Sequence, residues 1–497
     1  MEDYRLFIDG EWRASVDGRT VATINPATEE PWANVAAAGP ADVDAAVAAA
    51  HRSFKAGVWK DLAPAERGAI LARAASQILE RGDELAQLEV KDSGGTIRKA
   101  NMADIPATAQ TFQYYADLLS ELPEEETFEE MSPVQSTNII RREPIGVCAC
   151  ITPFNFPMAA ASWKIAPALA AGNSIIMKPS PYTPVTTLKL AEICHAAGVP
   201  AGVINVLCGP GAALGEALVT HANVEKIAFT GSTTVGKRVM ELAAPSLKKL
   251  TLELGGKSPN IILKDAPLDS AVRGALFGTF FHSGQVCESG TRVLVHASVY
   301  EEFVGKMVEG AKAIKIGDPM DPDSAMGPLV SSQQRDNTER YVHAGREEGA
   351  RVVTGGRRPP HLPKGYYYEP TIFVDVRNDM KIAREEIFGP VVSIIKFNDE
   401  EEALRIANDS IFGLGAAVWS TDLDRARKLA NRIESGTVWV NDYHLINVRF
   451  PFGGYKQSGF GRELGPQGLG EFQQIKHIHV GQPSDPAEKY YFGMLLD

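Results

Sequence analysis

The sequence predicts an α/β protein with two open-sheet lobes, and three observations support this. Short apolar segments alternate with helical segments between residues 146 and 254, and the same alternation starts again after Gly256. Strands that alternate with helices at this spacing are typical of βαβ units and parallel sheets. The chain has 497 residues, 44% hydrophobic and 23% charged, which is enough for compact units with large cores.

The part of the chain before residue 120 is predicted to be mostly helical. Residues 41–55 form one expected helix, and a second begins at Pro64, a residue that suits the first turn of a helix. A third ends near Ser93. Residues 136–142 are β-branched and lie between two prolines, so we expect them to form a strand on an exposed arm.

The two lobes are predicted to meet near residue 257. The expected strands of the first lobe are 146–151, 174–177, 203–207, 226–229 and 250–254, with helices at 159–171, 186–197 and 212–221. The expected strands of the second lobe are 260–263, 292–295, 351–354, 391–397, 416–419 and 437–441, with helices at 268–281 and 299–314.

Charge and composition exclude several classes of function. The net charge is −12 and the basic residues are scattered, which argues against a nucleic-acid partner. No basic-then-apolar leader and no long apolar run are present, so we expect no membrane span and a cytoplasmic protein. The five cysteines form no CxxC pair or Cys/His cluster, which indicates a reducing compartment and no metal site.

Cys287 is the candidate nucleophile. It lies in the segment Gly284–Gly290 among polar neighbours and glycines, which suits a thiol that must meet a substrate. An unreactive structural role is the alternative. The other four cysteines lie in apolar runs or near helix ends and are expected to be structural: Cys148, Cys150, Cys194 and Cys208.

Glu253 is the candidate base. It lies between two leucines at the end of an apolar strand and is followed by Gly255 and Gly256, which allow a close approach of the backbone. A carboxylate in such surroundings costs free energy unless it is paired or takes part in chemistry. A structural glutamate that caps a neighbouring helix is the alternative.

Two further segments join a strand to a helix. In Thr152–Pro157, Asn155 is flanked by aromatic residues and prolines, and its amide is a donor of the kind that stabilises an oxyanion. Turn formation alone also explains an asparagine there. Residues 229–236 form a glycine-containing turn that can place a phosphate at a helix N-terminus, although the turn lacks the GxGxxG pattern.

In order and spacing these segments resemble the aldehyde dehydrogenase superfamily. Glu253 and Cys287 are separated by 34 residues (287 − 253), as in that family, and the resemblance covers nearly the whole chain. The shared blocks are Phe7–Trp12, Asn25–Thr28, Pro153–Pro157, Lys178–Ser180, Phe229–Ser232, Glu253–Lys257, Gly284–Cys287, Glu385–Pro390, Pro451–Gly459 and Gly461–Glu463.

This resemblance implies the oxidation of an aldehyde to a carboxylic acid with NAD(P) and water. Cys287 would attack the aldehyde to give a thiohemiacetal, and Glu253 would activate the water that hydrolyses the thioester formed by oxidation. Asn155 and the Cys287 N–H would hold the oxyanion. Glu463 and Lys164 would form a proton relay with Glu253.

The family also implies a cofactor site at the ends of the first-lobe strands. Lys178 would bind the adenosine ribose, and Gly231 and Ser232 would approach the pyrophosphate. Glu386, with Phe388 beside it, would hold the nicotinamide ribose. The remaining expected cofactor contacts are Ile151, Thr152, Pro153, Phe154, Ser180, Pro181, Gly211, Phe229, Thr230 and Leu254.

Two positions depart from the common family pattern. Pro181 stands where many NAD-using members have a glutamate that accepts hydrogen bonds from the ribose hydroxyls. The loss of that charge removes a repulsion of the 2′-phosphate, so we expect the use of both NAD and NADP. His282 stands where many members have asparagine; a local hydrogen bond is its expected role, and a catalytic base is the alternative.

The same matching outlines a pocket for a small-molecule aldehyde. Its expected residues form an aromatic funnel with one polar group beside the nucleophile: Phe156, Ala160, Trp163, Phe281, Glu288 and Phe452. A mostly apolar funnel suits aliphatic or aromatic aldehydes. The alternative is that these residues are ordinary core.

The resemblance also divides the chain into parts. Residues 1–122 and 146–257 are expected to form a Rossmann-like dinucleotide-binding domain, and residues 258–457 a Rossmann-like catalytic domain. Residues 123–145 and 458–497 are expected to form a small β oligomerisation arm and a C-terminal tail. Unpaired strand edges invite pairing between subunits, so we expect a homodimer or a homotetramer.

Two other interpretations remain open. A CoA-acylating aldehyde dehydrogenase passes its thioester to CoA and needs no water-activating glutamate, so the presence of Glu253 argues against it. A non-catalytic protein on the same fold is the second alternative. The presence of Cys287, Asn155 and Glu253 together argues against that second alternative.

Overall fold

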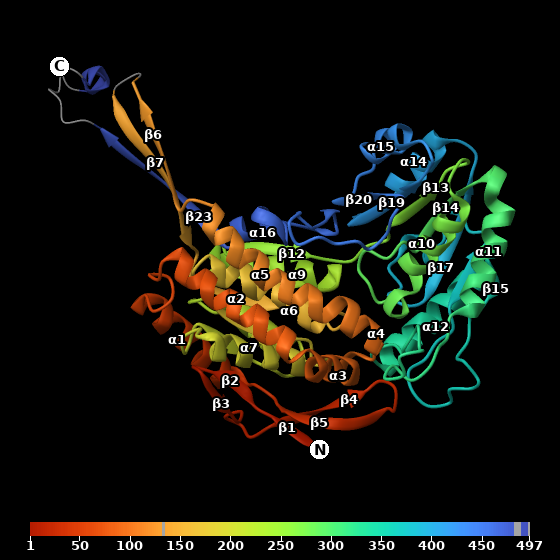
Figure 1. The fold of residues 1–497 in the computed structure, drawn as a ribbon, viewed down its shortest axis with the longest axis horizontal. Helices are drawn as coiled ribbons and strands as arrows, with labels where there is room; N and C mark the ends of the chain where they lie inside the picture. Colours follow the sequence, from red (N-terminus) through yellow and green to blue (C-terminus); the bar gives the residue numbers. More distant parts are fainter. Residues whose placement is uncertain (132–134, 482–488, 496–497) are drawn as a thin grey trace.

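The protein is seen in a computed structural model that describes residues 1–131, 135–481 and 489–495. Residues 132–134 of the predicted arm, and 482–488 and 496–497 of the predicted tail, lie outside the described residues. Figure 1 shows two α/β halves side by side and a thin arm that extends from the first half. The predicted α/β class with an extra β arm is therefore confirmed.

The first large sheet has eight strands in the order β22-β12-β11-β8-β9-β10-β2-β3. Its five inner strands from β12 to β10 run parallel, as the alternation of strands and helices predicts, and both edges are antiparallel. The strands are β2 (Leu6–Ile8), β3 (Glu11–Arg13), β8 (Val147–Ile151), β9 (Ser174–Lys178), β10 (Ile204–Val206), β11 (Lys226–Thr230), β12 (Lys249–Glu253) and β22 (Gly459–Phe460).

The helices of the first half bury one large apolar core with this sheet. α1 and α6 pack directly against its inner strands, while α2 and α5 pack on each other and on α6. The helices are α1 (Pro40–Ala56), α2 (Pro64–Glu80), α3 (Gly82–Ser93), α4 (Ile97–Lys99), α5 (Ile105–Glu121), α6 (Pro157–Ala170), α7 (Val185–Ala197), α8 (Ala212–Thr220), α9 (Thr233–Ala243) and α16 (Gly465–Gly470).

The second large sheet has seven strands in the order β15-β16-β17-β14-β13-β19-β20, all parallel except β15. The strands are β13 (Pro259–Ile262), β14 (Arg292–His296), β15 (Arg351–Thr354), β16 (Thr371–Val374), β17 (Val391–Phe397), β19 (Gly415–Trp419) and β20 (Thr437–Val440). The helices of this half are α10 (Leu268–Phe280), α11 (Tyr300–Ala313), α12 (Ser332–Glu347), α13 (Lys381–Arg384), α14 (Glu400–Asn408) and α15 (Leu423–Ala430).

Both faces of the second sheet are buried. Along β14, Leu294 belongs to one apolar cluster, whereas its neighbours Val293 and Val295 belong to another. Successive side chains of a strand point to opposite faces, so the two clusters lie on the two faces of the sheet. Burial of both faces explains why these strands are continuous apolar runs in the sequence.

The expectation that the first 120 residues are mostly helical is wrong for residues 2–36. That segment holds β2, β3 and three further strands: β1 (Glu2–Tyr4), β4 (Thr20–Asn25) and β5 (Glu30–Ala36). β2 extends the first sheet by pairing with β10, and the other three form a small sheet of their own. Strands of three to seven residues are too short to show a clear alternation, so the sequence pattern does not reveal them.

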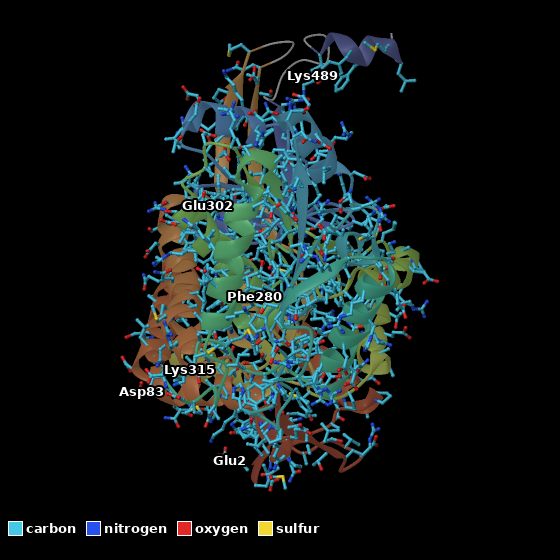
Figure 2. All side chains as sticks on the ribbon, turned by 90° about the vertical axis from the view of Figure 1, so that its right-hand side faces the viewer. Glu2, Asp83, Phe280, Glu302, Lys315 and Lys489 are labelled. Atoms are coloured by element: carbon cyan, nitrogen blue, oxygen red, sulfur yellow. The ribbon has the colours of Figure 1, made fainter. Side chains whose placement is uncertain are left out.

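The arm is a three-stranded antiparallel sheet in the order β23-β7-β6. It consists of β6 (Glu125–Glu130), β7 (Ser136–Pro144) and β23 (Gln473–Gly481), so the predicted strand at 136–142 is confirmed. Figure 2 places Lys489, beyond the tip of the arm, at the opposite end of the molecule from Glu2. Residues 459–470, assigned to the tail from sequence, lie on the first half instead, where β22 pairs with β12 and α16 contacts α6.

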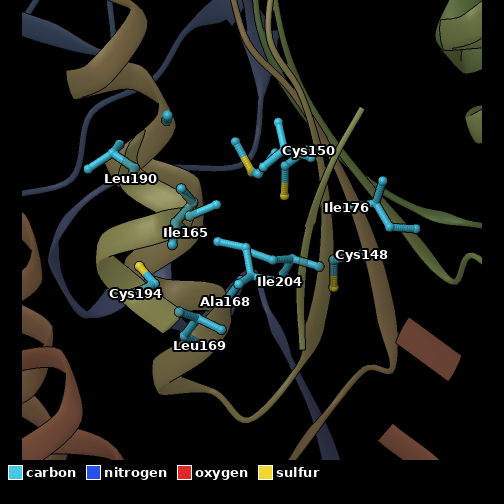
Figure 3. Packing of buried hydrophobic residues seen from close by; sticks show 14 of the residues in the cluster. Cys148, Cys150, Ile165, Ala168, Leu169, Ile176, Leu190, Cys194 and Ile204 are labelled. Atoms are coloured by element: carbon cyan, nitrogen blue, oxygen red, sulfur yellow. The ribbon is translucent and has the colours of Figure 1, made fainter. Parts of the chain in front are cut away.

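The four cysteines expected to be structural are fully buried and unpaired. Figure 3 shows Cys148, Cys150 and Cys194 among aliphatic side chains such as Ile165 and Leu169. Burial raises the pKa of the Cys194 thiol to about 12, so that thiol stays protonated and unreactive. Cys287 alone among the five is partly exposed.

The carboxyl ends of the parallel strands meet at one edge of the first sheet. Ile151, Lys178, Thr230 and Glu253 are the last residues of β8, β9, β11 and β12. Ligands of open α/β sheets bind outside the carboxyl ends of the strands, so the fold places these residues where a ligand is expected. Among the described helices, none is both long and apolar enough to cross a bilayer.

A buried arginine fixes the start of β14, five residues after Cys287. The Arg292 guanidinium donates to the backbone carbonyls of Lys257, Ile406 and Ala407, each at 2.9 Å, and to Asn378 Oδ1 at 3.1 Å. Burial lowers its pKa to about 10, so the group stays charged at neutral pH. These bonds tie the second sheet to the segment that leads out of β12.

We predict that Arg292→Met lowers the free energy of unfolding by about 3 kcal/mol or more, because three buried carbonyls lose their donor. Urea unfolding followed by circular dichroism measures the change. Arg377→Met is the control, since Arg377 is exposed and its guanidinium bonds the neighbouring Asp379. Equal midpoints for the two variants would contradict the prediction.

Candidate active site

A cavity of about 740 Å³ lies at the carboxyl ends of the first-sheet strands and reaches Cys287 and Asn155. Every residue predicted to contact a cofactor lines it: Ile151, Thr152, Pro153, Phe154, Lys178, Ser180, Pro181, Gly211, Phe229, Thr230, Gly231, Ser232, Leu254, Glu386 and Phe388. Residues that are more than 200 positions apart in the sequence therefore surround one cavity. Its volume suits a small-molecule or cofactor site.

The sequence analysis missed the helix faces that line this cavity. Most of the missed residues follow the helical spacing i, i+3, i+4, i+7 along α8 and α9, which was the signal available in the sequence. They are Ala212, Gly215, Glu216 and Val219 on α8, and Thr234, Val235, Arg238, Val239 and Leu242 on α9. Gly255 and Gln334 complete the set, and Gln334 comes from α12, which the sequence did not predict.

The turn between β11 and α9 faces the cavity with the N-terminus of a helix. Ser232 is the N-cap, and its hydroxyl accepts a hydrogen bond from Val235 N–H at 3.3 Å. The N-terminal end of α9 carries free N–H groups and the positive end of the helix dipole. This end of the cavity can therefore hold an anionic group such as a phosphate.

Lys178, at the end of β9, provides a buried cation in the lining of the cavity. Burial lowers the pKa of its ammonium group, and the described residues give it no ion-pair partner. Its Nζ approaches only the Pro179 carbonyl, at 3.5 Å. Ser180 and Pro181 line the cavity beside it, so this corner has a positive charge and a hydroxyl but no carboxylate of its own at position 181.

Glu386 enters the cavity from the second half of the molecule. Its Oε1 accepts a hydrogen bond from Gly256 N–H at 3.1 Å, and burial raises the pKa of this carboxyl to about 7. Two residues later, the Phe388 ring contacts the Phe154 ring edge to face at 5.5 Å. The two halves therefore meet across the cavity through a carboxylate and an aromatic pair.

The loop before the nucleophile is tightly folded. His282, Ser283 and Gly284 have φ values of 48°, 57° and 72°, a conformation that non-glycine residues rarely adopt. A Cβ at Gly284 would lie 2.2 Å from the Gly389 carbonyl oxygen, so only glycine fits there. Strain of this kind persists where the surroundings hold a residue in place, as they hold the segment that leads to Cys287.

Asn155 lies against this loop. Its Nδ2 donates to the Gln285 carbonyl at 2.8 Å, and the side chain is almost fully buried. A primary amide has two N–H donors, so one remains for a group bound near Cys287. The geometry brings together the predicted nucleophile and the predicted oxyanion donor.

The Cys287 thiol donates to Glu288 Oε2 at 3.1 Å. Burial, together with the negative charges of Glu288, Glu386 and Glu253, raises the pKa of this thiol well above its usual range. The resting enzyme therefore holds a protonated thiol at neutral pH.

Glu253 is buried at the end of β12, and neither carboxylate oxygen has a hydrogen-bond partner in the described residues. Burial and the nearby charge of Glu463 raise its pKa. An unpartnered buried carboxyl of this kind suits a group that works on a bound water or substrate. The structural alternative, in which Glu253 caps a helix, has no hydrogen bond to support it.

Lys164 and Glu463, which the resemblance assigns to a proton relay with Glu253, form an ion pair, and Lys164 Nζ also donates to Thr230 Oγ1 at 2.8 Å. Both side chains are buried. Neither hydrogen-bonds to Glu253 in the part of the chain that the structure describes. The charges of Glu463 and Lys164 act on the pKa of Glu253, and the relay itself stays a prediction.

The expected substrate residues fall into two groups. Trp163 and Phe452 contact each other at 5.5 Å and belong to the small cluster that includes Cys287. Phe156 contacts Phe281, which lines a second cavity of about 480 Å³ with Phe277 and the Arg98–Ala103 segment. The Glu288 carboxylate accepts a hydrogen bond from the Cys287 thiol, and Ala160 is buried on α6.

His282 is buried against the Phe156 ring at 5.6 Å and forms a hydrogen bond with the backbone of Asn155. Burial and the positive charge of Lys99 lower its pKa well below the usual range, so the ring is neutral. This supports the expected role in a hydrogen bond. In the described residues no group of three or more His, Cys, Asp or Glu side chains is placed to hold a metal.

Known proteins resemble this chain over nearly its full length. The model of the aldehyde dehydrogenase family matches residues 12–478. A betaine aldehyde dehydrogenase from Bacillus subtilis is 47% identical, covering 98% of this chain and 99% of that protein. An aldehyde dehydrogenase from Aspergillus niger is 44% identical, covering 95% of this chain and 94% of that protein.

Solved structures agree with this match. A betaine aldehyde dehydrogenase from Staphylococcus aureus in complex with NAD+ has a TM-score of 0.94 and 41% identity, covering 97% of this chain and 95% of that one. An aldehyde dehydrogenase from Bacillus cereus, also in complex with NAD+, has a TM-score of 0.94 and 43% identity, covering 97% of each chain. This chain belongs to the aldehyde dehydrogenase family.

Proposed function

We propose that this protein oxidises an aldehyde to a carboxylic acid with NAD(P)+ and water, through a covalent intermediate on Cys287. One observation carries the proposal: a single cavity joins all the expected cofactor contacts to a partly exposed thiol and its amide donor, Asn155. The binding of NAD+ by the Staphylococcus and Bacillus cereus structures supports the choice of cofactor.

The residues fit the cofactor at both ends of the cavity. The α9 N-terminus and Ser232 would hold the pyrophosphate, Lys178 the adenosine ribose, and Glu386 the nicotinamide ribose. When bound, the nicotinamide accepts a hydride. The Phe154 and Phe388 rings pack together in the lining of the same cavity.

The covalent chemistry belongs to the protein. The Cys287 sulfur attacks the aldehyde carbon, and the carbonyl electrons move to the oxygen, where Asn155 and the Cys287 N–H stabilise the charge. After oxidation the acyl group remains on sulfur as a thioester. Glu253 takes a proton from a water that attacks this thioester, and the Lys164–Glu463 pair accepts or returns protons nearby.

The buried, unpartnered carboxyl of Glu253 favours hydrolysis over transfer to CoA. A CoA-acylating enzyme needs no base for water at this place, whereas a buried carboxyl without a partner costs stability unless it has a task. The retention of Cys287 and Asn155 in one site argues against a non-catalytic role.

We predict that Glu253→Gln slows hydrolysis of the thioester far more than its formation. Rapid mixing with aldehyde and NAD+ should give a fast burst of reduced cofactor followed by a phase at least about 100-fold slower than wild-type turnover, because the water loses its base. Cys287→Ala is the matched control and should show neither burst nor turnover while it still binds NAD+. Loss of the burst in Glu253→Gln would place Glu253 in an earlier step.

Cofactor choice depends on the corner around Lys178. With Pro181 in place, no carboxylate at this position repels a 2′-phosphate, while Lys178 and Ser180 supply a positive charge and a hydroxyl. We therefore propose that the enzyme uses both NAD and NADP.

We expect Pro181→Glu to shift the ratio of kcat/KM towards NAD by about 1–2 kcal/mol, since a carboxylate gains hydrogen bonds from the ribose hydroxyls and repels a phosphate. Pro181→Gln introduces a side chain with the shape of glutamate but without its charge, so it should shift the kcat/KM ratio less. Both cofactors are measured with all three proteins. A wild-type enzyme that rejects NADP as fully as the glutamate variant does would show that position 181 is not the discriminator.

The proposed substrate is a small aldehyde with an apolar body. Trp163 and Phe452 beside Cys287, and Phe156 and Phe281 further out, give the approach an aromatic character. One relative, from Bacillus subtilis, is named a betaine aldehyde dehydrogenase, and another, from Aspergillus niger, is named simply an aldehyde dehydrogenase. Aromatic rings also accept a quaternary ammonium group, so this approach suits both neutral and cationic aldehydes.

The arm supports assembly into a homodimer or homotetramer. Within the described residues, each outer strand of the order β23-β7-β6 has one edge without a strand partner. Large apolar side chains of these strands are exposed, among them Phe128 and Ile475. Exposed strand edges with apolar side chains favour pairing with another chain.

Light scattering at micromolar concentration should give a multiple of the 53.7 kDa chain mass. The variant Phe128→Asp/Ile475→Asp should dissociate, because two charges would be buried in the interface. Leu423→Asp, at an exposed position on α15, is the control and should leave the mass unchanged. A monomeric mass for the wild type would contradict the proposed assembly.

A further inference from the structure

A buried carboxylate, Glu288, lies between the nucleophile and a histidine. Its Oε2 accepts the Cys287 thiol at 3.1 Å, and its Oε1 lies 3.1 Å from His444 Nδ1. The side chains of Glu288 and His444 are 5% and 4% exposed. The Tyr443 hydroxyl donates to the Glu288 backbone carbonyl at 2.8 Å, so the backbone that carries this carboxylate is held as well.

His444 is fixed by its own surroundings. It follows β20 in a loop, has a φ of 62°, and its ring contacts the rings of Phe277, Phe281 and Tyr443 at 5.3, 5.8 and 4.9 Å. In the described residues its Nε2 has no hydrogen-bond partner. The contact with Glu288 through Nδ1 is therefore the polar contact that orients this ring.

Glu253 does not compete for the thiol proton. The thiol is hydrogen-bonded to Glu288, while the Glu253 carboxylate faces the segment before Glu463, where a Cβ at Gly453 would lie 2.8 Å from its Oε1. The site thus contains two carboxylates with separate surroundings. Such a pair can divide two proton transfers between them.

We propose that Glu288 is the base that takes the proton of the Cys287 thiol, and that His444 is the positioning residue that holds Glu288 ionised and aimed at the sulfur. This proposal rests on the proposed function and adds to it. Glu253 is then left free for the water of the hydrolytic step.

The proton balance closes over one turnover. The S–H bond breaks as the proton passes to Glu288 Oε2, and the sulfur electron pair forms the new bond to the aldehyde carbon. When the thioester is hydrolysed, the sulfur leaves as a thiolate and takes the same proton back from the Glu288 carboxylic acid. The thiol proton therefore stays within the site, while the proton that Glu253 takes from the attacking water leaves to solvent as the proton released by the overall oxidation.

The charges around the sulfur explain why an internal transfer is needed. In addition to burial, the charges of three acidic groups from different segments raise the pKa of the Cys287 thiol: Glu288 beside it, Glu386 from the second half and Glu253 at the end of β12. A thiolate formed by loss of a proton to solvent would add a further negative charge to this buried cluster, and burial with these charges raises the pKa of the thiol. A transfer to Glu288 leaves the total charge unchanged.

Glu288 is ionised and ready to accept the proton. Burial acts to raise the pKa of this carboxyl, but the hydrogen bond and charge of His444, with the hydrogen bond from Cys287, outweigh burial and the pKa is lowered. The transfer of the proton from the Cys287 thiol to Glu288 is unfavourable, so the thiolate is a minor form. It is consumed as it attacks the aldehyde carbon. The resting thiol is correspondingly protected from oxidation.

The test is the rate at which iodoacetamide alkylates Cys287 as a function of pH, with peptide mass spectrometry to identify the site. In wild type the rate should change by less than about threefold between about pH 6 and pH 8, because thiolate formed by internal transfer does not depend on solvent protons. In Glu288→Gln the rate should rise about tenfold per pH unit, since the proton must be lost to solvent.

A second pair of variants tests the positioning role. His444→Gln keeps a side-chain N–H donor, so the alkylation rate should stay nearly independent of pH. His444→Leu removes the donor, so the alkylation rate should rise with pH as it does in Glu288→Gln. In the burst assay, Glu288→Gln should slow acylation much more at about pH 6 than at about pH 9, because only the low-pH reaction depends on the base. NAD+ binding checks that each variant is folded.

Two results would overturn the proposal. In the first, the wild-type alkylation rate rises tenfold per pH unit like that of Glu288→Gln. In the second, Glu288→Gln reacts faster than wild type at every pH, which would mean that Glu288 only repels a thiolate. Alkylation uses neither aldehyde nor cofactor, so its outcome is independent of whether the protein oxidises aldehydes.

Discussion

The site depends on a close contact where the chain passes from the first sheet to the second. After Glu253 ends β12, the backbone of Gly256 lies so near the nucleophile loop that a Cβ there would be 2.3 Å from the Cys287 carbonyl oxygen. The same segment donates from Gly256 N–H to Glu386. Glu253, Cys287 and Glu386, the proposed water-activating base, nucleophile and ribose ligand, are therefore positioned by one short stretch of backbone, and the glycines are required because no side chain fits.

Burial without full pairing gives this site its chemistry. Glu253, Glu288 and Glu386 all lie in the low-dielectric region around one thiol, and each has different partners. Glu253 has no hydrogen bond in the described residues, Glu288 is held by His444, and Glu386 accepts from a backbone N–H. Burial raises the pKa of Glu253 and Glu386, whereas for Glu288 the contacts with His444 and Cys287 outweigh burial and lower it, so three carboxyl groups can take different roles.

Much of this arrangement could be predicted from the sequence because the informative segments are local. The strand–loop–helix pattern predicted β8 to β12, and the motif residues from Ile151 to Phe388 meet in one cavity. The strands before residue 36 could not be predicted, since each is short, and β2 in addition pairs with β10 about 200 residues away. His444 could not be found either, because its contact with Glu288 joins positions 156 apart and no motif surrounds it.

The proposed reaction requires that Cys287 carries an acyl group during turnover. Its most direct test is peptide mass spectrometry of the enzyme quenched in acid shortly after mixing with NAD+ and an aldehyde. The peptide that contains Cys287 should carry the acyl group in place of the thiol hydrogen, with label from a deuterated aldehyde hydrogen absent from the adduct. Reduced cofactor formed without any acyl group on Cys287 would contradict the account.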